Sequence, residues 1–97
     1  MTMESSWPDK AQVRIHPQVL LHQVEDEAVL LNLDSGVYYG LDAVGARMMQ
    51  VVHQSATLGD AIGLLLREYE VDGTQLRADL HRLLDDMQAQ GLIVVER

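Results

Sequence analysis

The chain has 97 residues and a mass of 10.9 kDa, the size of one domain with a single modest core. Seven basic residues against fifteen acidic ones give a net charge of −8, which leaves no easily built basic face for nucleic acid or for an anionic membrane. The chain has no cysteine, so disulfides, thiolate metal sites and cysteine nucleophiles are excluded. No apolar run reaches the ~18–20 residues of a membrane span and no secretory signal is recognisable, so we expect a cytoplasmic protein.

The first half of the chain reads as strands that follow a short tail. Residues 1–10 are polar, lack periodicity and contain Pro8, so we expect a mobile tail ahead of a single domain over residues 11–97. Trp7 could anchor a partner, but a side chain that packs on the domain or stays solvated is the simpler interpretation. Extended segments are expected over 13–15, 19–24, 28–33 and 37–41, with a charged turn at 25–27.

The turn between 28–33 and 37–41 decides which side chains share a face of the sheet. A three-residue loop with Gly36 in the left-handed conformation pairs Leu33 with Val37, whereas a two-residue loop places Leu33 opposite Tyr38. We favour the three-residue loop because it gathers one apolar face. That face comprises Val29, Leu31, Leu33, Val37, Tyr39 and Leu41.

Three helices are predicted in the second half of the chain. Asp42 is a suitable N-cap for the first helix, over roughly 43–54, and Thr57 is a suitable N-cap for the second. Asp72 opens the third helix, with Gln75 as its capping-box partner. The predicted buried stripes are, in chain order, Val44, Met48, Val51 and Val52; Leu58, Ala61, Ile62, Leu65, Leu66 and Tyr69; and Leu76, Leu80, Leu83, Leu84 and Met87.

The end of the third helix carries a specific stop signal. Gly91 fits the left-handed C-cap of a Schellman motif, with Leu92 as its hydrophobic contact, and residues 93–95 can extend as a short strand. The order of strands, then three helices, then a strand indicates an α+β fold. A small antiparallel three-stranded sheet followed by three helices suggests a winged helix-turn-helix-like domain.

No constellation of catalytic or metal-binding residues is apparent. The histidines are scattered and no two have the spacing of helical metal ligands; they are His16, His22, His53 and His81. Ser35 lacks a neighbouring base, and Asp85 and Asp86 are adjacent on a predicted helix and so do not share a face. We therefore expect a protein that is not an enzyme, without catalytic residues, bound metal or cofactor.

The helices over residues 57–91 raise the alternative of a winged-helix DNA-binding regulator. This segment contains seven acidic residues against three arginines, a net charge of −4. A recognition helix that carries Asp79, Asp85 and Asp86 would be repelled by phosphates. The charge therefore argues against DNA as the ligand.

The strand over residues 37–41 is aromatic and lacks charge and proline, the usual guards of an exposed sheet edge. If it lies at an edge, it invites a peptide to add as a further strand. The alternative, equally supported by these residues, is that Tyr38 and Tyr39 bridge the sheet and the helices.

The stretch VLLNLDSGVYYGLDAVGARMMQVV, followed by two short helices and a final GLI, resembles the PqqD-like family. The pattern is an apolar strand ending in Asp, a Ser-Gly turn, a Tyr-Tyr-Gly-Leu strand and a first helix with Gly-Ala-Arg. The resemblance covers residues 12–94, and its central block is the most specific part. Met49 departs from the pattern, since many members carry Trp there, which affects core packing more than function.

Members of this family are recognition elements, or peptide chaperones, for the leader segments of ribosomally made precursor peptides, and they are not enzymes. The resemblance implies a winged-helix-like fold in which the leader adds to the third strand and lies against the third helix. The matching positions on the strand are Val37, Tyr38, Tyr39, Gly40 and Leu41. On the helix, its periodicity suggests Leu76, Asp79, Leu80, Leu83 and Met87.

Within the family, the Gly-x-Tyr-Tyr form looks closer to the lasso-peptide branch, whose partner enzymes are a leader peptidase and an ATP-dependent ring-closing synthetase. The alternative branch is a peptide chaperone of PQQ biosynthesis that acts with a radical SAM enzyme. Either branch implies a precursor peptide and its modifying enzymes as partners, without nucleic acid or membrane. The acidic chain favours a leader that carries lysine or arginine.

Overall fold

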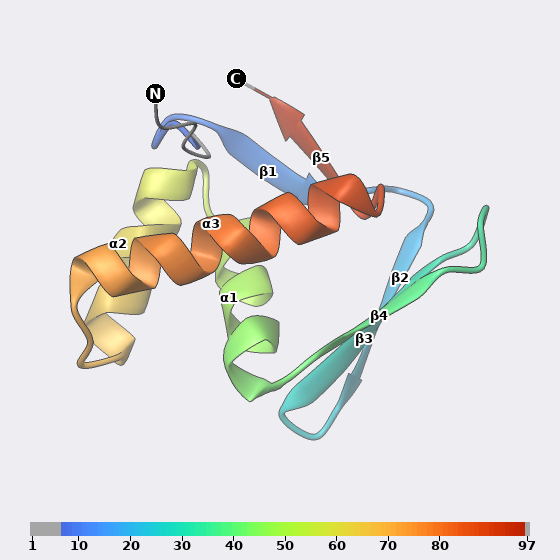
Figure 1. The fold of residues 1–97 in the computed structure, drawn as a ribbon, viewed down its shortest axis with the longest axis horizontal. Coiled ribbons are helices and arrows are strands. Elements are labelled where there is room, and N and C mark those ends of the chain that lie inside the picture. The colour runs from blue at the N-terminus through green and yellow to red at the C-terminus, as the bar shows by residue number, and fades with distance from the viewer. Residues whose placement is uncertain (1–6, 97) are drawn as a thin grey trace, which may run out of the picture.

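The computed structural model describes residues 7–96. Its elements are β1 (Gln12–Ile15), β2 (Val19–Val24), β3 (Glu27–Asn32), β4 (Tyr38–Leu41), α1 (Ala43–Gln54), α2 (Leu58–Glu68), α3 (Gly73–Ala89) and β5 (Ile93–Glu96) (Figure 1). The predicted order of strands, three helices and a final strand is confirmed.

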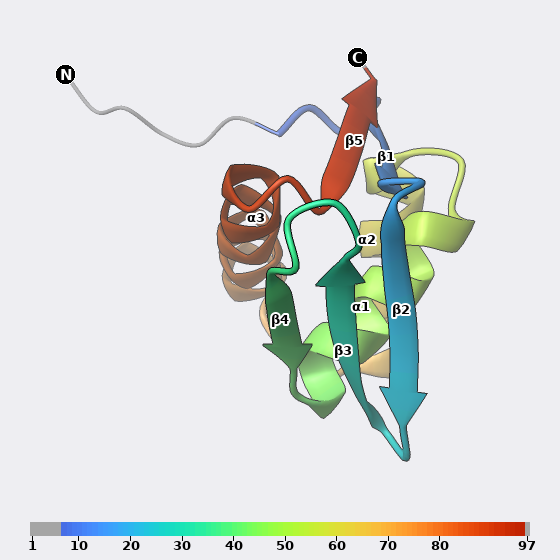
Figure 2. The ribbon, with the colours of Figure 1, turned by 90° about the vertical axis from the view of Figure 1, so that its right-hand side faces the viewer.

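The strands form two small antiparallel sheets. β2, β3 and β4 make a three-stranded sheet in chain order, and β1 pairs with β5, which joins the two ends of the described chain (Figure 2). Helix α1 contacts both sheets, and α3 contacts α2 and β5. The α+β class with three helices and a three-stranded antiparallel sheet is confirmed, whereas the winged-helix likeness is not.

The predicted register between β3 and β4 is wrong by one residue. Leu31 faces Tyr38, and Asn32 N–H donates to the Val37 carbonyl, so the loop between Asn32 and Val37 has four residues, 33–36. Leu33 therefore does not pair with Val37. The two-residue alternative, with Leu33 opposite Tyr38, is wrong as well.

The Asn32 side chain explains the longer loop. Its Oδ1 accepts hydrogen bonds from the backbone N–H groups of Asp34, at 2.9 Å, and Ser35, at 3.2 Å. Its backbone carbonyl accepts from Gly36, whose φ of +77° is the left-handed conformation that glycine adopts readily. An Asn side chain that satisfies the turn in this way lets the loop begin one residue earlier than the apolar pattern suggests.

The shift changes which side chains of β3 are buried, because successive side chains of a strand point to opposite faces. Ala28 and Leu30 pack into the core, opposite Leu41 and Tyr39 of β4. The predicted inward set of Val29, Leu31 and Leu33 is therefore wrong for this strand. Val29 and Leu33 are exposed, and Leu31 is partly exposed.

The helix caps follow the predictions closely. The side chains of Asp42, Thr57 and Asp72 accept from backbone N–H groups in the first turns of α1, α2 and α3. Gln75, the predicted capping-box partner of Asp72, instead donates to the Asp79 carboxylate at 2.9 Å.

The predicted Schellman motif at the end of α3 is confirmed. Leu92 N–H donates to the Met87 carbonyl at 2.9 Å and Gly91 N–H to the Gln88 carbonyl at 3.1 Å. Gly91 has a φ of +72° and Leu92 is fully buried. This turn reverses the chain so that β5 can pair with β1.

The apolar stripes of the three helices form most of the core, and the stripe of α3 lies at its centre. Leu76, Leu80, Leu84 and Met87 are buried, and Leu83 is partly buried against them. Two predicted stripe residues are wrong, since Val44 is 46% exposed and Leu66 is 39% exposed. Both lie at the margin of a stripe.

The expected mobile tail is wrong for residues 7–10, and residues 1–6 lie outside the described part of the chain. Trp7 is only 5% exposed and belongs to the core, and its indole N–H donates to the Asp85 carboxylate at 2.9 Å. Asp9 accepts two hydrogen bonds from the Arg77 guanidinium, at 2.8 and 3.1 Å. A large aromatic side chain buries enough apolar surface to order the polar residues that follow it.

Candidate functional site

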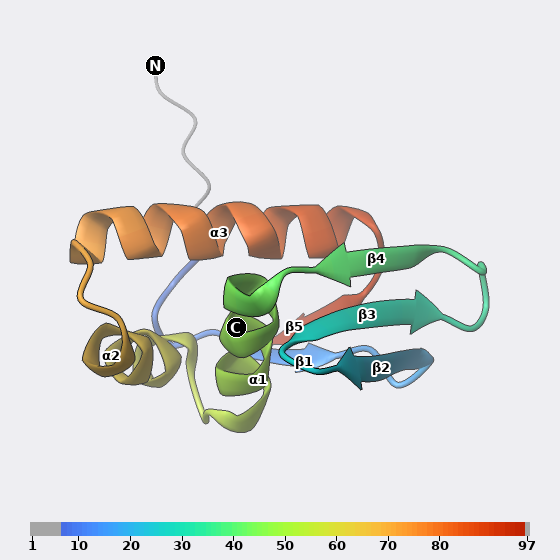
Figure 3. The ribbon, with the colours of Figure 1, turned by 90° about the horizontal axis from the view of Figure 1, so that it is seen from below.

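Strand β4 lies at an edge of the three-stranded sheet, since within the described residues it pairs with β3 alone. Its sequence, YYGL, carries neither charge nor proline. Helix α3 lies on the side of β4 away from β3 (Figures 2 and 3). The free edge therefore offers main-chain hydrogen-bonding groups next to a helix.

The register determines which main-chain groups of β4 are free. Asn32 N–H donates to the Val37 carbonyl at 2.8 Å, so this pair is hydrogen-bonded between the strands. Hydrogen-bonded and non-bonded pairs alternate along antiparallel strands, so the groups of Tyr39 point to β3. The N–H and C=O groups of Tyr38 and Gly40 therefore point to the free edge.

The side chain of Tyr39 ties β4 to α3. Its hydroxyl lies 3.4 Å from Asp86 Oδ2, and its ring packs against the core. Burial raises the pKa of Tyr39, and the charge and hydrogen bond of Asp86 add to the rise. The hydroxyl therefore keeps the proton that it donates to Asp86. Asp86 was not among the predicted contact residues.

The ten predicted peptide-contact residues divide by exposure. Direct contact is open to those at the surface, which are the exposed Val37, Tyr38 and Gly40 and the half-buried Tyr39, Asp79 and Leu83. The others are core side chains that support the strand and the helix from beneath: Leu41, Leu76, Leu80 and Met87. The helical period identifies the side of α3 that is buried, but that side faces the core rather than a ligand.

A small apolar pocket of about 140 Å³ lies where the start of α3 meets α1 and the connection from α2. Its lining comprises Val44, Met48, Tyr69, Val71, Gln75, Leu76 and Asp79. Of these, sequence reasoning proposed only Leu76 and Asp79. The Asp79 carboxylate accepts from Gln75 and lies 3.5 Å from the Arg82 guanidinium, so its charge is already partnered. One sequence signal could have indicated this pocket. Val71 is an apolar residue between the second and third helices that belongs to none of the predicted buried stripes.

Other classes of site find no support in the described part of the chain. No three His, Asp or Glu side chains among residues 7–96 gather in a way that could hold a metal ion. None of the helices there is both long enough and apolar enough to cross a bilayer. The free strand edge and the neighbouring apolar surface remain, which is the chemistry of a binding module for an extended peptide segment.

The chain belongs to the PqqD family. The family described as coenzyme PQQ synthesis protein D matches residues 27–93, which include β4 and α3. The resemblance drawn from the central sequence block is thereby confirmed. The comparison with curated protein sequences gave no match.

Two solved structures share the fold over nearly their whole length. TbiB1 in complex with the TbiA(β) leader peptide is 31% identical, with a TM-score of 0.77 over 82% of this chain and 93% of that one. A lasso peptide synthetase B1 complexed with its leader peptide is 26% identical, with a TM-score of 0.76 over 86% of this chain and 98% of that one. Both of these relatives are described as complexes with a leader peptide, and the second is described as a lasso peptide synthetase.

Proposed function

We propose that this chain binds the leader segment of a ribosomally made precursor peptide as a strand added to the free edge of β4. It then presents the precursor to the modifying enzymes of a lasso-peptide or related pathway, without catalysing a step itself. The observation that carries the proposal is the uncharged, proline-free edge of β4 beside α3. The two solved relatives, each in complex with a leader peptide, support it.

Strand addition separates affinity from specificity. The N–H and C=O groups of Tyr38 and Gly40 supply hydrogen bonds that any extended peptide can make. Alternate leader side chains then point toward α3, where Leu83 and the apolar pocket near Leu76 select them by shape. The acidic chain favours basic side chains elsewhere in the leader.

The partner enzymes that follow from the lasso branch are a leader peptidase and a ring-closing synthetase, in the cytoplasm. A PQQ pathway would instead supply a radical SAM enzyme and a small precursor. We favour the lasso branch because one of the two solved relatives is described as a lasso peptide synthetase. The neighbouring genes would distinguish the two pathways directly.

A proline at Tyr38 tests the proposed edge. Tyr38→Pro removes a main-chain donor that points to the leader, while Tyr38→Ala removes the same side chain and keeps the donor. We expect isothermal titration with the synthetic leader to give at least about tenfold weaker binding for Tyr38→Pro than for Tyr38→Ala. Circular dichroism confirms that both variants are folded.

A proline at Tyr39 provides the contrasting case. The N–H of Tyr39 points to β3, so Tyr39→Pro should damage the hairpin itself and lower the free energy of unfolding. If Tyr38→Pro stays folded and binds the leader as tightly as Tyr38→Ala, strand addition to β4 is wrong for this protein.

A further inference from the structure

Residues 7–11 lie against α3 before the chain enters β1, and we call them the Trp7 clasp. Trp7 is buried in the core, and its indole N–H donates to the Asp85 carboxylate at 2.9 Å. Asp9 accepts hydrogen bonds at 2.8 and 3.1 Å from the Arg77 guanidinium. Figure 3 shows this part of the chain crossing α3 on its way to β1. Since Arg77 and Asp85 are about two turns, or ~12 Å, apart along the helix axis, the clasp holds α3 at two points rather than one.

The Trp7 clasp is itself fixed to the start of α2. Gly59 N–H donates to the Asp9 carbonyl at 2.7 Å, and Leu58 N–H donates to the Ala11 carbonyl at 2.8 Å. Both donors belong to the first turn of α2, where backbone N–H groups have no partner within the helix. Gly59 permits this close approach, because a Cβ there would lie 3.1 Å from the Asp9 Cβ. The clasp therefore joins α3 to α2 as well as to β1.

The proposed leader site lies on the opposite flank of α3. An α-helix turns by about 100° per residue, so residues four apart share a flank. Arg77 and Asp85 belong to one flank, and the buried Nε2 of His81 between them shows that this flank is covered. Leu83 and Asp86 belong to the flank that faces β4, and the buried stripe of α3 lies between the two flanks. The clasp therefore acts on α3 from the side away from the leader.

Direct contact between α3 and β4 is weak. The helix packs on α2 and β5, and the hydrogen bond from the Tyr39 hydroxyl to Asp86 of α3 is long, at 3.4 Å. A leader strand added to β4 has to fit between β4 and α3. The separation of these two walls is therefore set by what holds α3 from its other flank.

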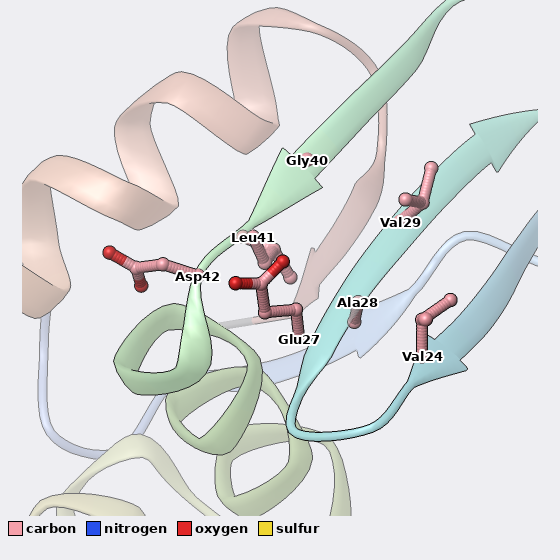
Figure 4. A pocket seen from close by; sticks show the side chains of 7 residues that line it. All are labelled: Val24, Glu27, Ala28, Val29, Gly40, Leu41 and Asp42. Carbon is pink, nitrogen blue, oxygen red and sulfur yellow. The ribbon is translucent and has the colours of Figure 1, made fainter.

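Strand β4, in contrast, is held independently of the Trp7 clasp. It pairs with β3, Leu41 is buried, and Asp42 caps α1 by accepting from Gly45 N–H at 2.8 Å. Figure 4 shows Leu41 and Asp42 where β4 runs into α1, beside Ala28 and Val29 of β3. A change in the clasp therefore moves one wall of the site and leaves the other in place.

We propose that Trp7 and Asp9 are positioning residues of the leader site, which hold α3 at the separation from β4 that a leader strand fits. The inference rests on the proposed function and adds to it residues that do not touch the leader. Without the clasp, α3 would sample positions too close to β4 or too far from it, and only the fraction in the competent position could bind. The apparent dissociation constant rises as that fraction falls, while the contacts made by β4 stay the same.

The double variant Trp7→Phe with Asp9→Ala tests the clasp. Phenylalanine keeps an aromatic ring in the core but cannot donate to Asp85, and alanine removes the carboxylate that pairs with Arg77. The probe is the synthetic leader peptide of the precursor encoded beside this chain. We expect isothermal titration to give about fivefold weaker binding or more, the lower end of ordinary coupling between two sites. Circular dichroism confirms that the variant is folded.

Glu68→Ala is the matched control. It removes the acidic partner of Arg47 in an ion pair that joins α1 to α2, and it changes the net charge by as much as Asp9→Ala does. Leader affinity should stay unchanged in this variant. Asp9→Ala alone keeps the test available if the double variant does not fold, because the side chains of its ion pair are 54% and 44% exposed. It should weaken leader binding by about twofold or more.

The fluorescence of Trp7, the one tryptophan of the chain, reports the clasp directly. If a closed clasp favours leader binding, bound leader favours the closed clasp by the same factor. Acrylamide quenching of Trp7 in the parent chain should therefore decrease when leader is added, although the leader binds on the opposite flank of α3. The leader peptide for this measurement carries phenylalanine in place of any tryptophan, so that the emission comes from Trp7 alone.

Two results would overturn this inference and leave the proposed function standing. One is that the folded clasp variant binds leader as tightly as Glu68→Ala does. The other is that bound leader leaves the quenching of Trp7 unchanged. If the parent chain itself does not bind leader, the proposed function fails, and the positioning role of Trp7 and Asp9 fails with it.

Discussion

Leu84 and Leu80 lie on the buried side of α3, and neither exposes any of its surface. Leu84→Ala should lower the free energy of unfolding by about 2–5 kcal/mol, because burial of the removed atoms is lost and a cavity remains. Urea titration measures this change. The fluorescence of Trp7, the one tryptophan of the chain, reports the transition because its ring is buried in the same core.

Leu64→Ala is the matched control for this measurement. Leu64 lies on the outer side of α2 and is 45% exposed, so its truncation should change the free energy of unfolding by less than about 0.5 kcal/mol. An equally small effect at Leu84 would contradict the buried stripe of α3.

His81 should make stability depend on pH. Burial lowers its pKa, the positive charge of Arg77 adds to this, and Asp85 and Asp9 oppose it. Its Nε2 is buried without a hydrogen-bond partner among the described residues. The unfolded chain therefore takes up a proton near the ordinary pKa of 6.5 while the folded chain resists it. Stability is full above that pH and falls as the pH drops below it.

The variant His81→Gln isolates this effect. Urea midpoints between about pH 8 and pH 5.5, spanning the ordinary histidine pKa, should fall less for His81→Gln than for the parent. His22→Gln, a change at an exposed histidine of β2, should keep the parent's dependence. Equal slopes for His81→Gln and the parent would exclude His81 as the source.

Single residues also mark the limits of what the sequence predicts. The polar surroundings of Trp7 indicated a tail, and only the tertiary structure reveals the core space that its ring fills. Val44 fits the helical period of α1 but is 46% exposed. Periodicity identifies the apolar side of an element, whereas burial requires a neighbour that the local sequence does not specify.

At the scale of elements, helices and their caps were predictable because each carries its own signals. The hairpin register was not, because the apolar pattern favoured a three-residue loop and gave no signal of the turn that the Asn32 side chain stabilises. The hydrogen bonds that the Asn32 side chain accepts favour a third loop length, and a change of one residue exchanges the faces of β3. The same change places Val29 and Leu31 on the side of the sheet that faces away from the core.

The C-cap of α3 gives a test of this element-level reasoning. Gly91 has a φ of +72°, and a Cβ there would meet no atom closer than 4.0 Å. Gly91→Ala should therefore cost about 1 kcal/mol through the left-handed backbone alone. Gly63→Ala, inside α2 with nothing within 4 Å, should instead stabilise the protein by about 0.8 kcal/mol.

Thermal or urea unfolding of the two alanine variants shows whether their changes in the free energy of unfolding have opposite signs. Both changes add one methyl group to an open position, so they differ only in backbone conformation. A stabilising effect of Gly91→Ala would contradict the Schellman motif.

At the scale of the whole molecule, the pairing of β1 with β5 and the approach of α3 to β4 join segments far apart in the sequence. Such contacts leave no local pattern, so periodicity alone did not predict them. The family resemblance, and not the periodicity, indicated that the third strand of the sheet and the third helix belong to one site.

The charge of the whole molecule carries the last prediction, which separates a peptide-binding module from a DNA-binding regulator. The net charge is −8, and α3 places Asp79, Asp85 and Asp86 among only two arginines. Binding to duplex DNA depends on releasing counterions from phosphates, which an acidic surface cannot do. We therefore expect no shift of mixed-sequence duplex DNA at low salt, up to about 100 µM protein, the weak end of ordinary non-specific affinity. The same preparation must bind leader peptide, so that inactive protein is excluded. Micromolar DNA binding that weakens steeply with salt would contradict the peptide-binding assignment.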